Sequence, residues 1–252
     1  MAVPIHKTGL WKTLGQKGPS IVSDDLIGNF IPSQGITSVS WTNQAAVNSL
    51  RRYNGITYNS SSPQNFQFDG TDDYLGEASS GYGGNPFNVA FQNAYTIGQW
   101  VYLPNTWTSG NIHILFYFYE DSSNYVMFQI DGAVVEIHSY TSSGNYANIS
   151  ISPNFNPRSE RDKWLYYTIT HSSGTYKLFV NGTFVGNQST FAPTATAKPL
   201  TVGRYGSSYT SANVKVGHIH VYSSALSNSQ IRQNYLAIAS PTNTRLYGET
   251  AL

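Results

Sequence analysis

The chain has 252 residues, of which only 11% are charged, and its 14 basic and 13 acidic residues leave a formal net charge of +1. This length is enough for one sizeable core, and all-β domains often reach it. A face that binds nucleic acid needs clustered lysine and arginine. The sequence has no such cluster, so we expect no nucleic-acid partner. The absence of cysteine excludes disulfides and thiolate metal sites.

No segment is apolar over the length of a signal peptide or of a membrane-spanning helix. Together with the absence of cysteine, this favours a chain that folds in a reducing cytoplasm and has no membrane partner. We therefore expect synthesis in the cytoplasm without a signal peptide.

Residues 1–35 differ in pattern from the rest of the chain. Lysines alternate there with glycine, proline and isolated apolar residues, without helical or strand periodicity. We interpret this segment as an extended arm that docks on a partner, with Trp11 as its apolar anchor and Lys7 and Lys12 beside it. The alternative is a terminus without fixed structure.

From about residue 36 onward the pattern indicates strands. Residues 147–152 and 165–170 alternate apolar and polar side chains, as half-buried antiparallel strands do, with the odd-numbered side chains predicted inward. Residues 112–119 are apolar on both faces, which predicts a strand covered on both sides. Because several such strands follow one another without a helix between them, two packed antiparallel sheets are predicted.

Two dipeptides predict tight hairpins between these strands. Asp131-Gly132 and Asn181-Gly182 each separate two strand-like runs. Both dipeptides tolerate the positive φ angles that a type I′ turn requires. The same turn chemistry explains Asp69-Gly70, which leads into another strand.

One helix is predicted near the end of the chain, over residues 225–237. Ser227 or Asn228 can cap its first turn, and Leu226, Ile231 and Tyr235 fall near one face. The sequence therefore divides into the arm, a sandwich over residues 36–240 and a C-terminal tail over residues 241–252.

The order of five segments resembles the concanavalin A-like lectin/glucanase superfamily in its laminin-G-like branch. The segments are FDGTDDYL (68–75), AYTIGQWVYLP (94–104), KWLYYTITHSSGTYKLFVNGTFVG (163–186), PLTVGRYG (199–206) and VKVGHIHVYSSALSNSQIRQNY (214–235). The resemblance covers roughly residues 36–237 and implies a jelly-roll sandwich with one concave face and with loops at one edge used for ligands or partners. Such modules are similar to those of bacteriophage virion proteins, especially marine ones.

The glutamates argue against a hydrolase. Glucanases of this superfamily carry two glutamates flanking an aspartate on one strand, so that alternate carboxylates reach the cleft. This sequence has no such pattern, and none of its glutamates lies within four residues of another. We therefore expect no enzymatic activity.

Two groups of side chains are candidate metal ligands. His218 and His220 share a strand face, but no third ligand is near in sequence, so an exposed histidine pair is the favoured interpretation. Asp69, Asp72 and Asp73 could supply hard oxygen ligands to calcium. We favour a turn there, with Asp72 and Asp73 projecting into solvent, and keep calcium as the alternative. The resemblance weakens calcium further, since Gly217 stands where the family usually has an aspartate.

Aromatic residues in loop-like segments are the candidate contacts for glycans or partner proteins. Such rings stack on sugar faces, and tyrosine and tryptophan suit protein interfaces equally well. The candidates are Tyr82, Trp107, Tyr146, Tyr205 and Tyr209.

The function that we expect is that of a non-enzymatic bacteriophage virion structural protein, a capsid decoration or a tail or fibre accessory on the exterior of the particle. It would act through contacts with other virion proteins, as a homo-oligomer or in many copies. The alternative is a carbohydrate-binding module that recognises host-surface glycans during adsorption. No cofactor is expected apart from the calcium alternative.

Overall fold

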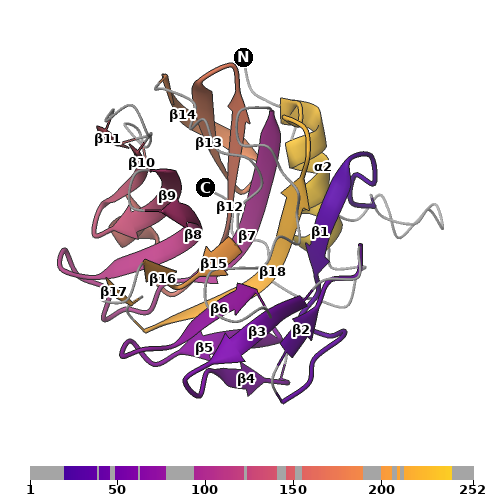
Figure 1. Ribbon diagram of the computed structural model, residues 1–252, viewed down its shortest axis with the longest axis vertical. Helices are drawn as coiled ribbons and strands as arrows, with labels where there is room; N and C mark the ends of the chain where they lie inside the picture. The colour runs from indigo at the N-terminus through magenta and orange to yellow at the C-terminus, as the bar shows by residue number, and fades with distance from the viewer. Residues whose placement is uncertain are drawn as a thin grey trace.

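The computed structural model describes residues 20–38, 40–45, 49–61, 63–77, 94–121, 124–140, 146–150, 155–189, 200–205, 209–210 and 213–239. These residues form two eight-stranded antiparallel sheets, a short two-stranded ribbon and one α-helix (Figure 1). The predicted two-sheet sandwich with a short C-terminal helix is confirmed.

Sheet A pairs its strands in the order β14–β13–β12–β7–β18–β5–β4, and β1 also pairs with β18. Its strands are β1 (Leu26–Phe30), β4 (Thr57–Asn59), β5 (Asn65–Phe68), β7 (Tyr95–Tyr102), β12 (Trp164–Ser172), β13 (Thr175–Val180), β14 (Thr183–Ser189) and β18 (Val214–Tyr222).

Sheet B has the order β11–β10–β9–β8–β15–β6–β3–β2. Its strands are β2 (Ser40–Thr42), β3 (Ser49–Tyr53), β6 (Tyr74–Glu77), β8 (Ile112–Asp121), β9 (Asn124–Asp131), β10 (Val134–Tyr140), β11 (Tyr146–Ser150) and β15 (Leu200–Val202). The ribbon consists of β16 (Arg204–Tyr205) and β17 (Tyr209–Thr210), and a 3-10 helix spans Pro157–Glu160.

The core lies between the sheets, and the strand register lines up its apolar side chains. Ile169 of β12 lies opposite Ile97 of β7 on one side and Leu178 of β13 on the other. All three side chains are at most 1% exposed. Burial of such side chains is the main stabilising contribution to a sandwich of this kind.

Both faces of β8 are covered, as its apolar sequence predicts. Leu115 and Phe118 belong to the main core. Ile114 and Tyr117 pack with Met127 in a smaller cluster that is separate from the main core.

The outer side of sheet A is covered as well, which the alternating pattern of β12 did not predict. The odd-numbered side chains from Leu165 to Ile169 face the core as expected. Tyr166 is nevertheless 1% exposed. Its ring stacks on Trp100 at 5.4 Å, and Trp100 stacks on Tyr235 of the helix α2 (Asn228–Ala239) at 5.8 Å. The expectation of a half-buried β12 is wrong because α2 covers this strand.

The helix α2 begins where the sequence predicts. Ser227 Oγ accepts a hydrogen bond from the N–H of Gln230 at 3.4 Å, and Gln230 Oε1 accepts one from the N–H of Ser227 at 2.9 Å. This reciprocal pair is a capping box. Ile231 and Tyr235 are 0% and 5% exposed, so the predicted apolar face is confirmed.

One of the two predicted hairpin turns is confirmed and the other lies one residue further along the chain. Asn181 and Gly182 have φ angles of 50° and 73°, both positive as a type I′ turn requires. At the other hairpin, Asp131 belongs to strand β9 and pairs with Val134 of β10. The turn therefore consists of Gly132 and Ala133, and the φ angle of Gly132 is 53°.

The sandwich begins before residue 36. The N–H of Val22 donates to Asn234 Oδ1 at 2.8 Å, and the hydroxyl of Tyr222 donates to the carbonyl of Val22 at 3.1 Å. β1 then pairs with β18, and Phe30 is fully buried. The prediction of an arm over residues 1–35 is therefore wrong for residues 20–35, because their apolar side chains pack into the domain.

Among the described residues, no helical segment has the length and hydropathy that spanning a membrane requires.

Candidate functional site

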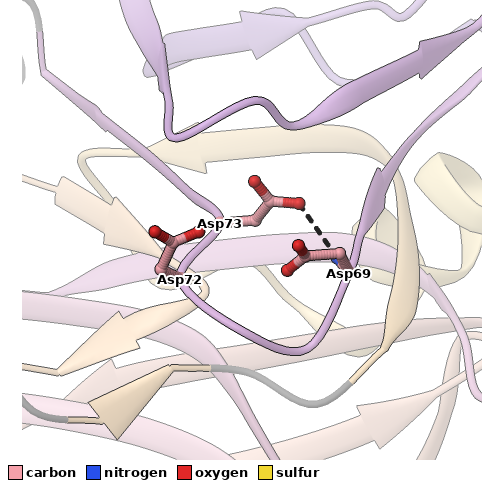
Figure 2. A group of neighbouring side chains, drawn as sticks. All are labelled: Asp69, Asp72 and Asp73. Atoms are coloured by element: carbon pink, nitrogen blue, oxygen red, sulfur yellow. Dashed lines mark hydrogen bonds between the residues drawn. The ribbon is translucent and has the colours of Figure 1, made fainter.

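The three aspartates lie on the loop that joins β5 to β6 (Figure 2). Asp69 Oδ1 accepts a hydrogen bond from the N–H of Thr71 at 2.7 Å, and Asp73 Oδ2 accepts one from the N–H of Asp69 at 2.9 Å. Gly70 has a φ of 86°, which residues with a side chain rarely adopt. The turn predicted at Asp69-Gly70 is confirmed.

Asp73 differs from its expected position. It was expected to project into solvent, yet it is 3% exposed, whereas Asp69 and Asp72 are exposed. Burial raises the pKa of Asp73, the bond from the Asp69 N–H lowers it, and the charges of Asp69 and Asp72 raise it further. The loop therefore holds a buried carboxyl group against two like charges.

These carboxylates fit part of a calcium site. One oxygen from each of Asp69, Asp72 and Asp73 lies within 4.8 Å of the others, and no other acidic or histidine group of this size occurs among the described residues. Calcium takes six to eight oxygen ligands. Two of the carboxylate oxygens already accept backbone hydrogen bonds. Bound calcium stays the untested alternative to a simple turn.

The side of sheet B that faces away from the core carries a strip of aromatic rings. We call it the tyrosine face, and its members come from β3, β6, β8, β9, β10 and β16: Tyr53, Tyr74, Tyr117, Tyr125, Tyr140 and Tyr205. All of them are half-buried except Tyr117, which is 2% exposed.

The rings of the tyrosine face contact one another across the strands. Tyr205 packs edge-on against Tyr117 at 5.0 Å and Tyr125 at 5.7 Å, and Tyr125 stacks on Tyr140 at 5.9 Å. The ribbon of β16 and β17 therefore holds a tyrosine over β8 and β9.

A second part of the same face combines tyrosine with arginine. Tyr53 and Tyr74 lie opposite each other in the register and stack at 4.3 Å with an interplanar angle of 3°. The guanidinium of Arg204 lies over Tyr74 at 4.6 Å, and that of Arg51 lies over Tyr53 at 5.2 Å. Such cation–π contacts hold both guanidinium groups against the sheet.

A polar group borders the rings on β9 and β10. Glu136 Oε2 accepts hydrogen bonds from Gln129 Nε2 at 3.0 Å and from His138 Nε2 at 3.1 Å. The bond to His138 lowers the pKa of Glu136, burial opposes this, and the Gln129 bond adds to the lowering. Sequence reasoning missed this group. The signal was the spacing of two from Glu136 through His138 to Tyr140, which places all three on one face of a strand.

The structure places the remaining predicted contacts as follows. Trp107 is 1% exposed, belongs to the core and donates its indole N–H to the carbonyl of Gly132 at 2.9 Å, so its predicted role as a contact for a glycan or a partner protein is wrong. Tyr205 lies on the tyrosine face. The backbones of Tyr146 and Tyr209 lie in β11 and β17, opposite Tyr140 and Tyr205. Outside the described residues lie Tyr82 and the predicted arm residues Lys7, Trp11 and Lys12.

The histidine pair is buried, contrary to the favoured interpretation. His218 and His220 are 4% and 0% exposed, and their ring centroids are 4.2 Å apart. His218 Nε2 lies 2.7 Å from Asn29 Oδ1, and His220 Nδ1 lies 3.0 Å from the hydroxyl of Tyr166. Burial lowers the pKa of His220 to about 3, so this ring is neutral at physiological pH. The pair is therefore a polar part of the interior.

Two antiparallel sheets with this strand order form a lectin-type β-sandwich. One outer face of this sandwich carries aromatic and polar side chains of the kind that bind ligands. The sequence matches the concanavalin A-like lectin/glucanases superfamily over residues 69–232. This is more than half of the chain, which therefore belongs to that superfamily. No curated protein matches the chain.

Solved structures with a similar fold include receptor-binding domains of botulinum neurotoxins. The domain of the C/D mosaic serotype is 15% identical, with a TM-score of 0.66, over 85% of this chain and 51% of that chain. The type D domain is 17% identical, with a TM-score of 0.66, over 84% and 52%. The type G domain is 13% identical, with a TM-score of 0.63, over 84% and 51%. The chain thus spans about half the length of these structures, and the likeness is one of fold.

Proposed function

We propose that the chain is a non-enzymatic structural protein on the exterior of a bacteriophage virion, and that the tyrosine face is its contact surface for other virion proteins. The observation that carries this role is the strip of half-buried tyrosines with Arg51 and Arg204 laid over two of them. Tyrosine and arginine are enriched in protein interfaces and among the few residues that carry most of the binding energy. The virion setting is supported by the resemblance of the segment order to phage modules.

The contact role is tested by reversing a charge on the tyrosine face. We expect Arg204→Glu to reduce the incorporation of the protein into particles by about tenfold or more, since it places a carboxylate against Tyr74 in the contact. Arg158→Glu, on the 3-10 helix, is the matched control and should leave incorporation unchanged. The measurement is quantitative mass spectrometry of purified particles. Absence of the wild-type protein from particles would contradict the proposal.

The non-enzymatic part of the proposal is most sharply tested at Glu136 and Asp131. They lie on the same side of the β9–β10 hairpin, and burial together with the charge of Glu136 raises the pKa of Asp131, whereas that of Glu136 is lowered. Such divergence also occurs in acid–base pairs of glycosidases. Here Gln129 and His138 both bond the same oxygen of Glu136, which favours a binding role.

We therefore expect no release of reducing sugar from a panel of polysaccharides incubated with the full chain. Turnover that disappears in Glu136→Gln would overturn the non-enzymatic proposal, because this change removes the charge while keeping the shape of the side chain.

Glycan recognition is the second candidate function, and the polar group beside the rings favours it. Tyr125 and Tyr140 offer aromatic surface to a sugar, and the Glu136–His138 pair offers an acceptor and an imidazole to its hydroxyl groups. We expect an array of neutral glycans to show binding by the wild type that is lost in Tyr205→Ala. If no neutral glycan binds, the tyrosine face keeps only its structural role.

A further inference from the structure

A pocket of about 500 Å³ lies on sheet A, away from the tyrosine face. One wall consists of side chains from β12 and β13, and the other is the turn that leads into α2. The lining residues are Thr170, Ser172, Thr175, Lys177, Ala225, Leu226, Ser227 and Asn228. Cross-strand pairing fixes the first wall, since Thr170 lies opposite Lys177 and Ser172 opposite Thr175.

The second wall is held in place by buried hydrogen bonds. Thr96 Oγ1 donates to the carbonyl of Ser224 at 2.8 Å and accepts from the N–H of Leu226 at 2.8 Å. The capping box between Ser227 and Gln230 fixes the next residues. The pocket is therefore preformed, which reduces the entropy lost when a ligand binds.

The lining is polar and its charge is positive. Six of the eight lining residues are polar, four of them with a hydroxyl group, and none of the eight is acidic. Lys177 is exposed at this pocket, and no described carboxylate lies within ion-pair distance of it. The N-terminal end of α2 adds positive potential, and its first turn contains no acidic residue.

The volume and the lining together indicate the class of ligand. Since a water molecule takes about 30 Å³ in the liquid, a volume near 500 Å³ is much larger than a bare anion needs. Hydroxyl groups on both walls suit a ligand that itself carries several hydroxyls, and Leu226 and Ala225 offer a small apolar surface to a ring. A single ammonium group beside the helix end suits one negative charge.

We propose that this pocket is a second binding site, specific for a carboxylated sugar residue. Lys177 and the first turn of α2 bind the carboxylate, and the hydroxyls of Thr170, Ser172 and Thr175 bind those of the sugar. This site is separate from the tyrosine face and does not depend on the function proposed for that face.

The test measures binding of sialyllactose and tetragalacturonate to the full chain by calorimetry. Lactose and methyl-esterified tetragalacturonate are the neutral counterparts, and sulfated lactose separates carboxylate from general anion binding. We expect at least one carboxylated probe to bind about tenfold or more tightly than its neutral counterpart and than sulfated lactose. Lys177→Met should abolish the difference, whereas Lys163→Met, which removes the same charge elsewhere, should preserve it.

Backbone amide shifts supply a readout that does not depend on a variant. The bound carboxylate should shift the N–H signals of Ser227 and Asn228, and Tyr205→Ala should leave binding intact. The proposal is overturned if neither carboxylated probe binds, if Lys177→Met binds like the wild type, or if Tyr205→Ala abolishes binding. If Lys177→Met is incorporated into particles at the wild-type level, the pocket and the tyrosine face act separately. If its incorporation is lost, the two sites serve the same function, which would contradict the separation proposed above.

Discussion

At Asp73, burial and two neighbouring carboxylates act on the same side chain. Because these effects raise the pKa of Asp73 above its unfolded value, ionised Asp73 opposes folding, and stability falls as the pH rises from the unfolded pKa through the folded one. We expect Asp73→Asn to raise the free energy of unfolding at pH 7 by about 0.5 kcal/mol. The amide oxygen can still accept from the Asp69 N–H. Urea denaturation in EDTA measures the change.

The gain should shrink at pH 3, where Asp73 of the wild type is protonated. Asp72→Asn is the exposed control and should change stability less. A less stable Asp73→Asn in EDTA would contradict this account. Repeating the measurement in excess calcium tests the calcium alternative, since calcium bound at this loop should stabilise the wild type and not Asp73→Asn.

Strand β10 offers a prediction on the scale of one element. The hydrogen bond from His138 lowers the pKa of Glu136 below its unfolded value. Its contribution to stability is therefore complete above the unfolded pKa and is lost as the pH falls through the folded pKa. We expect Glu136→Gln to cost about 1 kcal/mol at pH 7 and to flatten the stability profile below pH 5. Glu160→Gln, in the more exposed pair with Lys163, should cost less than about 0.5 kcal/mol.

Strand β7 requires glycine at one position for a steric reason. A Cβ atom on Gly98 would lie 2.2 Å from the hydroxyl oxygen of Tyr166. That ring cannot move freely, because it is buried against Trp100 and its hydroxyl contacts His220. We expect Gly98→Ala to cost about 2 kcal/mol, measured by thermal or urea unfolding. Gly110→Ala is the matched control, since its Cβ would meet nothing within 4 Å, and an equal cost in both would contradict the steric explanation.

On the scale of the whole molecule, periodicity and turn chemistry were sufficient to predict the sandwich. Asn181-Gly182 adopts the positive φ angles that its residues favour, and the pattern of β12 identified its core side. Local sequence patterns did not predict the burial of a side chain by a segment that lies far away in the sequence. Tyr166 is buried in a cluster with Trp100 and Tyr235, and Tyr235 lies far along the chain.

The candidate site was harder to predict than the fold. Tyr53, Tyr125 and Tyr205 share a face only because β3, β9 and β16 are brought to one side of the sandwich, and strand order cannot be read from local sequence. Trp107 was misassigned because polar neighbours suggested a loop tip, whereas its indole turns inward to the carbonyl of Gly132. Tyr205, predicted as a contact for a glycan or a partner protein, lies on the tyrosine face, and its binding role is still a prediction.

The last prediction concerns the start of the domain, where the segment that ends with β1 packs against β18. Asn29 Oδ1 lies 2.7 Å from His218 Nε2, Phe30 is fully buried, and Val22 exchanges hydrogen bonds with Asn234 and Tyr222. A chain that starts at residue 20 keeps all of these contacts, and one that starts at residue 31 loses them.

We expect the shorter chain to be less stable than the longer one by at least about 4 kcal/mol, or not to fold, because it exposes buried histidine and aromatic side chains and removes a paired strand. Circular dichroism and urea unfolding of the two truncated chains measure the difference. Equal stabilities would contradict this account, because residues 20–30 would then contribute nothing to the stability of the domain. A large difference would show that residues 20–30 belong to the domain, which leaves residues 1–19 as the untested part of the predicted docking arm.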